Sequence, residues 1–489
     1  MELLSPAGNI EKLQYAYEYG ADAAYIGLKR FSLRVKADNF YDNEYEKIVQ
    51  LKRLYPNKKL YCALNISFHN RDIQHFLDEI DYFKSYPIDA FIVQDIGIVP
   101  ILQKHFPHAA LHLSTQANCI NKEAVKMYQN MGFSRVVLGR EASLAEIREI
   151  KDAVPSMELE VFAHGAMCVA YSGRCLMSAY MTARSANGGF CSHSCRWEYR
   201  LGANPEIIKD GLIKNNATIS QSAIKELAQS GALFLEEHER PGEFFPVFEG
   251  DNFTAILSSK DICMVDHLDD MKKAGIDSLK IEGRMKSVYY VAMVTRAYRK
   301  ALDVLEGKIS QEEANPFINE LYKAAHREFA TGFYYKREDA DKTTVGSSES
   351  EYEMVGTITE VLSCEQEQKV FEFIKTEKAK YDKKLSEMHP VKREAILSDA
   401  AKKIDFLTEA KEGYHFYSFN SLNKFDAGTV LEYVEPNILA TEDSDYVLIS
   451  PNDGSVMNWV CHGHDCLIYS SKKIALNSIV RAKAEAVKK

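Results

Sequence analysis

Short apolar runs alternate with amphipathic stretches of helical period over the first three hundred residues. Each run is rich in aliphatic, aromatic or β-branched residues and ends in a glycine or a polar residue, which is typical of a buried strand. Eight such runs occur, at residues 2–8, 23–27, 60–66, 90–95, 111–116, 135–141, 159–165 and 278–284. The alternation of strands and helices predicts an α/β fold with a parallel sheet.

The stretches between these runs carry helix signals. Residues 10–19 place Leu13, Ala16 and Tyr17 on one face and precede Gly20, a residue type common just after a helix. Ser143 is followed three residues later by Glu146, which is a capping-box pattern. Eight strand–helix units favour a (β/α)8 TIM-like barrel over residues 1–340, with an open doubly wound sheet as the alternative.

In such a barrel the active site lies where the strands end, at the carboxyl-terminal face. The residues at the predicted strand ends are polar, and their convergence predicts a pocket. They are Asn65, Gln94, Asp95, Ser114, Gln116, Arg140, Glu141, His164, Glu282 and Arg284. Within this set, His164, Glu141 and Glu282 are the candidate catalytic residues.

After about residue 345 the pattern changes to that of a second, β-rich domain over residues 345–489. Short alternating runs at 354–361, 369–374, 424–434 and 445–449 predict antiparallel strands of a small β-barrel-like domain. A charged segment at about 376–413 predicts a solvated helical insertion. Residues 470–489 form a basic segment that we expect to be a helical tail.

Composition narrows the class of protein. The 489 residues are 46% hydrophobic and carry a net charge of −10, which is ordinary for a globular protein and argues against nucleic-acid coating through bulk charge. No run is long and apolar enough for a membrane span, and no secretion signal is recognisable, so we expect a cytoplasmic protein without membrane partners. Residues 272–300 hold eight basic and two acidic residues, which predicts a local phosphate-contacting face.

Four of the ten cysteines lie close together, in a predicted insertion at about 166–277 after the seventh strand. They are Cys168, Cys175, Cys191 and Cys195, and Cys263 follows in the same insertion. Cytosolic thiols are kept reduced, so clustered cysteines there are more often ligands than disulfides. The irregular spacing with intervening glycines favours an iron–sulfur cluster over zinc, which prefers paired short knuckles. No HExxH, GxSxG or P-loop motif occurs, so standard hydrolase and nucleotide-driven chemistry lacks support.

Several motifs together resemble peptidase family U32, the collagenase-like proteins, over about residues 1–305. They include "ELLSPAG", "YGADAAYIG", "EVFAHGAMCVAYSGRC", "CSHSCRWEY", "SSKDIC" and "SLKIEGRMKSVYY". Within that family the chain is most similar to the bacterial tRNA hydroxylation proteins, because "RPGEFFPVFEGDNFTAILSSKD" and the β-rich part also match that subgroup.

The resemblance implies oxygen-independent formation of 5-hydroxyuridine at the wobble position of tRNA, with prephenate as a co-substrate. It also implies a [4Fe–4S] cluster on Cys168, Cys175, Cys191 and Cys195. Related quinone-pathway proteins use a cysteine at the position of Cys263, so either Cys195 or Cys263 is a spare, and we favour the contiguous set. The partner would be the anticodon loop, whose unstacked bases can enter a pocket.

Substrate-binding candidates follow from this chemistry. A dicarboxylate calls for arginine forks, for which Arg34, Arg140 and Arg284 are the candidates. Tyr171 is a candidate for stacking on a base. Three alternatives stay open: a collagenase-like peptidase, a hydroxylase of ribosomal RNA or of a quinone precursor on the same scaffold, and a scaffold in which a metal only ties down the insertion.

Overall fold

The structure is a computed structural model of the chain, which divides into two compact units, Met1–Glu349 and Ser350–Lys489. It describes residues 1–28, 31–32, 40, 44–168, 170–178, 191, 259–336, 350–399 and 404–487 with their side chains. It describes the backbone alone at 234–236, 244–246, 248–249 and 254–255. Each unit is considered by itself below.

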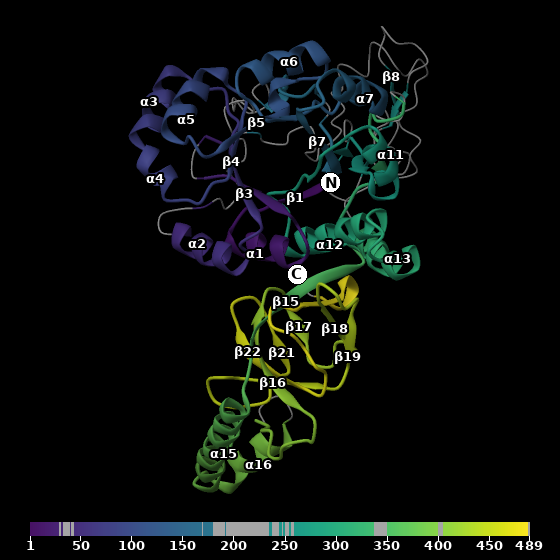
Figure 1. Ribbon diagram of the computed structural model, residues 1–489. Coiled ribbons are helices and arrows are strands. Elements are labelled where there is room, and N and C mark those ends of the chain that lie inside the picture. Colours follow the sequence, from purple (N-terminus) through teal and green to yellow (C-terminus); the bar gives the residue numbers. More distant parts are fainter. Residues whose placement is uncertain are drawn as a thin grey trace, which may run out of the picture. The chain divides into compact units, whose positions relative to one another are not determined.

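The first unit is a closed barrel of eight parallel strands, as the sequence predicts (Figure 1). Each strand pairs with the next along the chain, and the last strand closes the ring by pairing with both the first and the seventh. The barrel strands are β1 (Glu2–Pro6), β2 (Ala23–Ile26), β3 (Lys59–Leu64), β4 (Ala90–Val93), β5 (Ala110–Leu113), β6 (Arg135–Val137), β7 (Glu158–Ala166) and β13 (Ser278–Ile281).

Helices surround this ring of strands (Figure 1). Their starts match local signals: the Asn9 side chain accepts from the Lys12 amide at the start of α1, and Ser143 and Glu146 form the expected capping box on α7. The helices are α1 (Ile10–Glu18), α2 (Glu44–Leu54), α3 (Asn70–Asp78), α4 (Ile80–Lys84), α5 (Val99–His105), α6 (Lys122–Asn130), α7 (Leu144–Ala153), α11 (Leu268–Lys273), α12 (Val288–Leu305) and α13 (Gln311–Asn319).

Strand β7 is longer than its neighbours and carries a second ladder at its carboxyl end. There β12 (Asp261–Cys263) pairs with it antiparallel, and β14 (Phe329–Ala330) pairs with β12. In the ladder to β13, Phe162 lies opposite Lys280 but His164 lies opposite Ile281, so β7 contains one extra residue at this point. Such a bulge changes the face to which the following side chains point.

The second unit is an antiparallel sheet of seven strands with its own apolar core, which includes Val355, Phe419, Tyr433, Ile468 and Val480. The strand order is β19 (Thr441–Asp443), β18 (Leu431–Val434), β23 (Ile479–Lys483), β15 (Tyr352–Val361), β16 (His415–Ser421), β22 (Asp465–Ser470) and β20 (Tyr446–Ile449). Two short strands, β17 (Phe425–Asp426) and β21 (Trp459–Val460), pair separately.

Two predictions for this unit were wrong. Residues 369–374 are not a strand but part of helix α15 (Cys364–Ser386), which begins with a capping box of Ser363 and Gln366 and is followed by α16 (Pro390–Ser398). The good helix formers around the short apolar run set its structure. The tail predicted as a helix instead contributes β23 to the centre of the sheet, where its apolar residues are buried.

Part of the predicted basic face over residues 272–300 is not available at the surface. Lys280 points into the barrel, Arg296 is buried over the Phe317 ring, and Arg299 forms ion pairs with Asp22 and Asp303. These three side chains are held within the unit, whereas Lys272 and Lys273 of α11 are exposed. Among the described residues, no helix is both long and apolar enough to cross a bilayer.

Candidate active site

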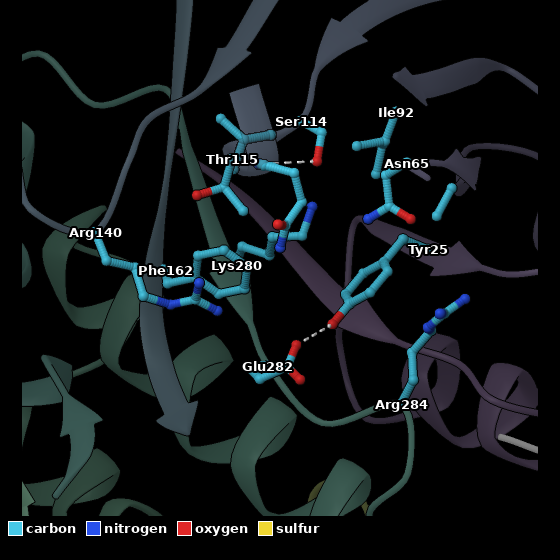
Figure 2. Close-up of a pocket in the computed structure, with 13 residues that line it drawn as sticks. Tyr25, Asn65, Ile92, Ser114, Thr115, Arg140, Phe162, Lys280, Glu282 and Arg284 are labelled. Carbon is cyan, nitrogen blue, oxygen red and sulfur yellow. Dashed lines mark hydrogen bonds between the residues drawn. The ribbon is translucent and has the colours of Figure 1, made fainter. Parts of the chain in front are cut away.

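A polar pocket opens at the carboxyl ends of the barrel strands, where the sequence predicts a site (Figure 2). Seven of the eight strands, or the residues directly after them, contribute to its wall. The lining residues are Tyr25, Ala63, Asn65, Ile92, Ser114, Thr115, Gln116, Val137, Arg140, Phe162, Lys280, Glu282 and Arg284. Six of the ten predicted strand-end residues are in this wall: Asn65, Ser114, Gln116, Arg140, Glu282 and Arg284.

Arg140 is the most unusual group in this wall. Its side chain is 8% exposed, and the guanidinium carbon lies 3.8 Å from the centre of the Phe162 ring. Its Nε is buried and has no hydrogen-bond partner among the described residues. Holding a buried cation without a counter-ion costs several kcal/mol, on the order of a lost buried pair. The pocket therefore presents a cation that is suited to an anionic ligand.

Arg284 lies across the pocket from Arg140 in the view of Figure 2, with Glu282 and Tyr25 between them. Its Nη2 donates to the Ser32 hydroxyl at 2.6 Å. The Tyr25 hydroxyl donates to the main-chain oxygen of Ile281 at 3.0 Å and lies 3.3 Å from Oε2 of Glu282. Glu282 is the one carboxylate among the described lining residues, so it is the pocket's candidate for proton transfer.

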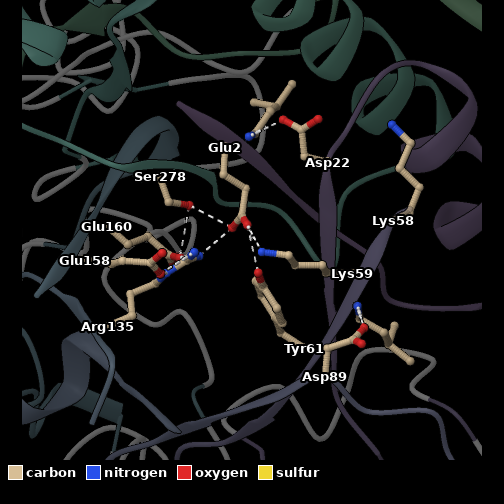
Figure 3. Close-up of polar contacts among 12 residues, drawn as sticks. Glu2, Asp22, Lys58, Lys59, Tyr61, Asp89, Arg135, Glu158, Glu160 and Ser278 are labelled. Atoms are coloured by element: carbon tan, nitrogen blue, oxygen red, sulfur yellow. Dashed lines mark hydrogen bonds and ion pairs between the residues drawn. The ribbon is translucent and has the colours of Figure 1, made fainter. Parts of the chain in front are cut away.

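Below the pocket, the barrel interior holds a network of buried charges. Glu160 accepts from Lys280 at 2.8 Å. It also accepts from Arg135 at 3.0 Å, and Arg135 pairs with Glu2 as well (Figure 3). Burial by itself would raise the pKa of Glu160, but the adjacent Lys280 and Arg135 hold this pKa below its ordinary value. Glu160 thus neutralises Lys280 at the pocket floor, whereas Arg140 in the wall has no carboxylate partner among the described residues.

His164, expected at the pocket rim, lies instead on the outer side of β7. Its ring packs against Tyr290 and Tyr298 of α12, and its Nδ1 is 3.5 Å from the Tyr298 hydroxyl. Burial is the main reason that the pKa of His164 falls to about 3. The bulge in β7 causes this placement, because it ends the alternation that would have put His164 on the same face as Glu160 and Phe162.

Glu141 lies beside the pocket and does not line it. Its Oε1 accepts from the Ser172 amide at 2.7 Å, and its Oε2 accepts from the Asn118 side-chain amide at 3.3 Å. Ser172 belongs to the segment between Cys168 and Cys175. Glu141 therefore connects the first part of the cysteine-rich segment to the rim of the pocket.

The candidate metal ligands are only partly described. Cys168 is exposed and Cys175 and Cys191 are partly exposed, whereas Cys195 lies outside the described residues. Cys263 stands opposite His164 in the β7–β12 ladder, with its sulfur 4.0 Å from the Tyr298 hydroxyl, and burial raises its pKa to about 11. Within the described part of the chain, no three His, Cys, Asp or Glu side chains are placed to hold a metal ion.

Two substrate-binding candidates remain. Arg34 lies outside the described residues. Tyr171 is 55% exposed and sits between the described cysteines Cys168 and Cys175, so its ring is accessible for stacking. Of the strand-end set, Asn65, Ser114 and Gln116 line the pocket, whereas the Asp95 side chain caps the start of the next helical turn and Gln94 donates to Ser67.

Sequence reasoning missed seven of the lining residues, among them Tyr25, Phe162 and Lys280. A signal was present, because Lys280 alternates with Ser278 on one face of β13, and Phe162 alternates with Glu160 on β7. Polar residues at every second position of a strand that is otherwise apolar indicate an interior face of the barrel.

Comparisons with known proteins bear on this site. The model of peptidase family U32 matches residues 8–344. A "tRNA hydroxylation protein P" of Escherichia coli is 40% identical over 338 residues, which cover 68% of this chain and 74% of that protein. A "tRNA hydroxylation protein P1" of Bacillus subtilis is 38% identical over 363 residues, which cover 73% and 76%. A 23S rRNA 5-hydroxycytidine synthase of Escherichia coli is 34% identical over 305 residues, which cover 62% of this chain and 40% of that protein.

Proposed function

Because the chain belongs to peptidase family U32, with relatives named for RNA hydroxylation, we propose that it hydroxylates a pyrimidine of tRNA. The structural observation that carries the proposal is the cationic pocket at the barrel mouth, with a cysteine-bearing segment attached to its rim. A pocket of this kind can accept a single unstacked base or a small anion, and the thiols beside it can hold a redox group.

The finer parts of the proposal come from the family resemblance. The target would be the wobble uridine in the anticodon loop, the product 5-hydroxyuridine, and the cluster ligands Cys168, Cys175, Cys191 and Cys195. A bound [4Fe–4S] cluster would supply one-electron redox chemistry, which zinc lacks. The described thiols reach the surface but do not by themselves form a ligand set, so the cluster rests on their spacing and chemistry.

Prephenate would bind through its carboxylates in the same pocket. Arg140 supports this part of the proposal, because its buried guanidinium lines the pocket and, in the part of the chain that the structure describes, pairs with no carboxylate. A ligand carboxylate would pair with it in an environment from which water is largely excluded, where a charged hydrogen bond is strong.

Glu282 would act as the proton acceptor in the pocket. Replacing a ring hydrogen by a hydroxyl group of water removes two electrons and releases two protons, one from the ring carbon and one from the water. The electrons would pass through the redox group to an external electron acceptor. Glu282, the carboxylate among the described pocket-lining residues, would take the proton from the ring carbon. The Tyr25 hydroxyl, 3.3 Å from Oε2, holds this carboxylate in place. At the pocket floor, Lys280 donates to Glu160 at 2.8 Å.

The test is nucleoside analysis of tRNA by mass spectrometry, in cells that lack the gene and in cells complemented with variants. We expect loss of 5-hydroxyuridine-derived nucleosides, their return with the wild-type chain, and no return with Cys168→Ser. Cys364→Ser, an exposed cysteine at the start of α15 in the other unit, is the matched control and should restore them.

Unchanged nucleosides in the deleted cells would refute tRNA hydroxylation. Iron and sulfide analysis of protein purified without oxygen tests the cluster separately, because a colourless, iron-free wild-type protein would refute the cluster alone. Hydrolysis of gelatin by the protein, with no change in tRNA nucleosides, would favour the collagenase-like alternative.

A further inference from the structure

The segment between Cys168 and Cys175 contains a turn whose middle residues pack against the barrel mouth. The turn is closed by the Arg174 amide, which donates to the Tyr171 carbonyl at 3.0 Å. Ser172 is only 4% exposed, whereas Tyr171 beside it is 55% exposed. The turn is therefore fixed at Ser172 and presents Tyr171 outward.

Two hydrogen bonds fix Ser172 to the residues that follow β6. Its amide donates to Oε1 of Glu141 at 2.7 Å, and its hydroxyl accepts from the Arg140 amide at 3.3 Å. The second oxygen of Glu141 accepts from Asn118, which follows β5. One carboxylate thus joins the turn to two neighbouring loops of the barrel mouth, and a hydrogen bond to an ionised acceptor is stronger than a neutral one.

Gly173 makes the turn fit against the pocket wall. Its φ is +74°, and a Cβ built on it would lie 1.9 Å from the main-chain oxygen of Gln116. Any other residue at this position would push the turn away from the wall. Gln116 and Arg140 both contribute side chains to the pocket, so the turn touches two pocket residues through their main chains.

We propose that Glu141 is a positioning residue, which seats the cysteine-bearing turn on the pocket rim and so fixes the separation between the pocket and the thiols of Cys168 and Cys175. The role rests on the proposed function, in which the reacting base and the redox group must be held at a set distance. Glu141 was a candidate catalytic residue, but both of its oxygens already accept hydrogen bonds outside the pocket. Glu141 would affect the reaction by holding Ser172, and with it the turn, in place.

The experiment compares the full-length wild type with Glu141→Ala and Glu141→Gln, and with Glu149→Ala as the control. Glu149 is an exposed glutamate on the following helix α7. Hydrogen–deuterium exchange of the peptide that contains residues 170–176 measures the seating. Turnover of tRNA under anaerobic conditions gives kcat, and the dependence on prephenate gives KM.

We expect Glu141→Ala to accelerate exchange at Ser172 by roughly 10-fold or more, because its amide loses a charge-assisted acceptor. It should lower kcat by about 10–100-fold, since a misplacement of about 1 Å can cost that much, while KM changes little. Glu141→Gln retains an acceptor for the Ser172 amide and should keep most of the slow exchange and most of kcat. Glu149→Ala should match the wild type in both quantities. Gly173→Ala, which disturbs the same docking from the other side, should reproduce the Glu141→Ala result.

Exchange that stays slow in both Glu141→Ala and Gly173→Ala would overturn the seating. Fast exchange with an unchanged kcat would overturn the functional role of Glu141. A change in KM for prephenate without a fall in kcat would overturn it as well. If the wild-type protein hydroxylates no tRNA, the proposed function fails, and the exchange comparison still decides whether Glu141 seats the turn.

Discussion

Nζ of Lys280 lies 2.8 Å from Oε1 of Glu160 inside the barrel, and the same carboxylate also binds Arg135. Removing one member of a buried pair leaves an uncompensated charge, which costs about 3–5 kcal/mol. We therefore expect Glu160→Gln to lower the free energy of unfolding by that amount, measured by urea denaturation with hydrogen exchange in β7 as the local probe. Glu158→Gln is the matched control, because Glu158 also binds Arg135 but is half-exposed, and it should cost less than about 1 kcal/mol. Equal losses in the two variants would contradict the buried network.

His164 should make the barrel less stable in acid. Its folded-state pKa of about 3 lies below the ordinary value near 6.5, so its contribution is present above pH 6.5 and is lost as the pH falls toward 3. This loss amounts to roughly 1 kcal/mol per pH unit within that window. In His164→Gln, the free energy of unfolding should depend less steeply on pH between pH 6 and pH 4 than in the wild type, by roughly 1 kcal/mol per pH unit. Replacing the exposed His108 with Gln should leave the slope unchanged.

Arg140→Met should separate ligand binding from stability. The substitution removes a buried cation for which the described residues supply no carboxylate, so we expect the melting temperature to stay level or to rise. Binding of prephenate, measured by calorimetry, should weaken by about 10–100-fold, since a charge-assisted hydrogen bond is lost. Arg148→Met, on the surface helix α7, should change neither quantity. A lower melting temperature with unchanged binding would make Arg140 a structural residue.

Residues 350–489 should fold without the barrel. They form a compact unit with its own buried core, in which the last strand β23 lies between β18 and β15. The isolated fragment should show a cooperative urea transition by circular dichroism, because a single core of this size supports two-state unfolding. Deleting residues 479–489 should abolish that transition, since β23 pairs on both sides. A fragment that unfolds without cooperativity would show that it depends on the barrel.

The local pattern determined much of this protein. The eight apolar runs became the eight barrel strands, and the capping box at Ser143 and Glu146 became the start of α7, because burial and end-capping act over a few residues. The position of the pocket followed as well, since the strands of a closed parallel barrel all end at one face. Arg140, Glu282 and Arg284 could therefore be placed in one site from the sequence.

The tertiary structure decided what depends on neighbours that are distant in the sequence. One extra residue in β7, visible only in its register with β13, moved His164 from the rim to the outer layer. Lys280, one cation among many in the sequence, became part of the interior because Glu160 on another strand neutralises it. The basic tail became strand β23 because β15 and β18 pair with it on both sides. In each case the outcome depends on the energy of a contact between segments that are distant in the sequence. The local sequence pattern does not show which segments come into contact.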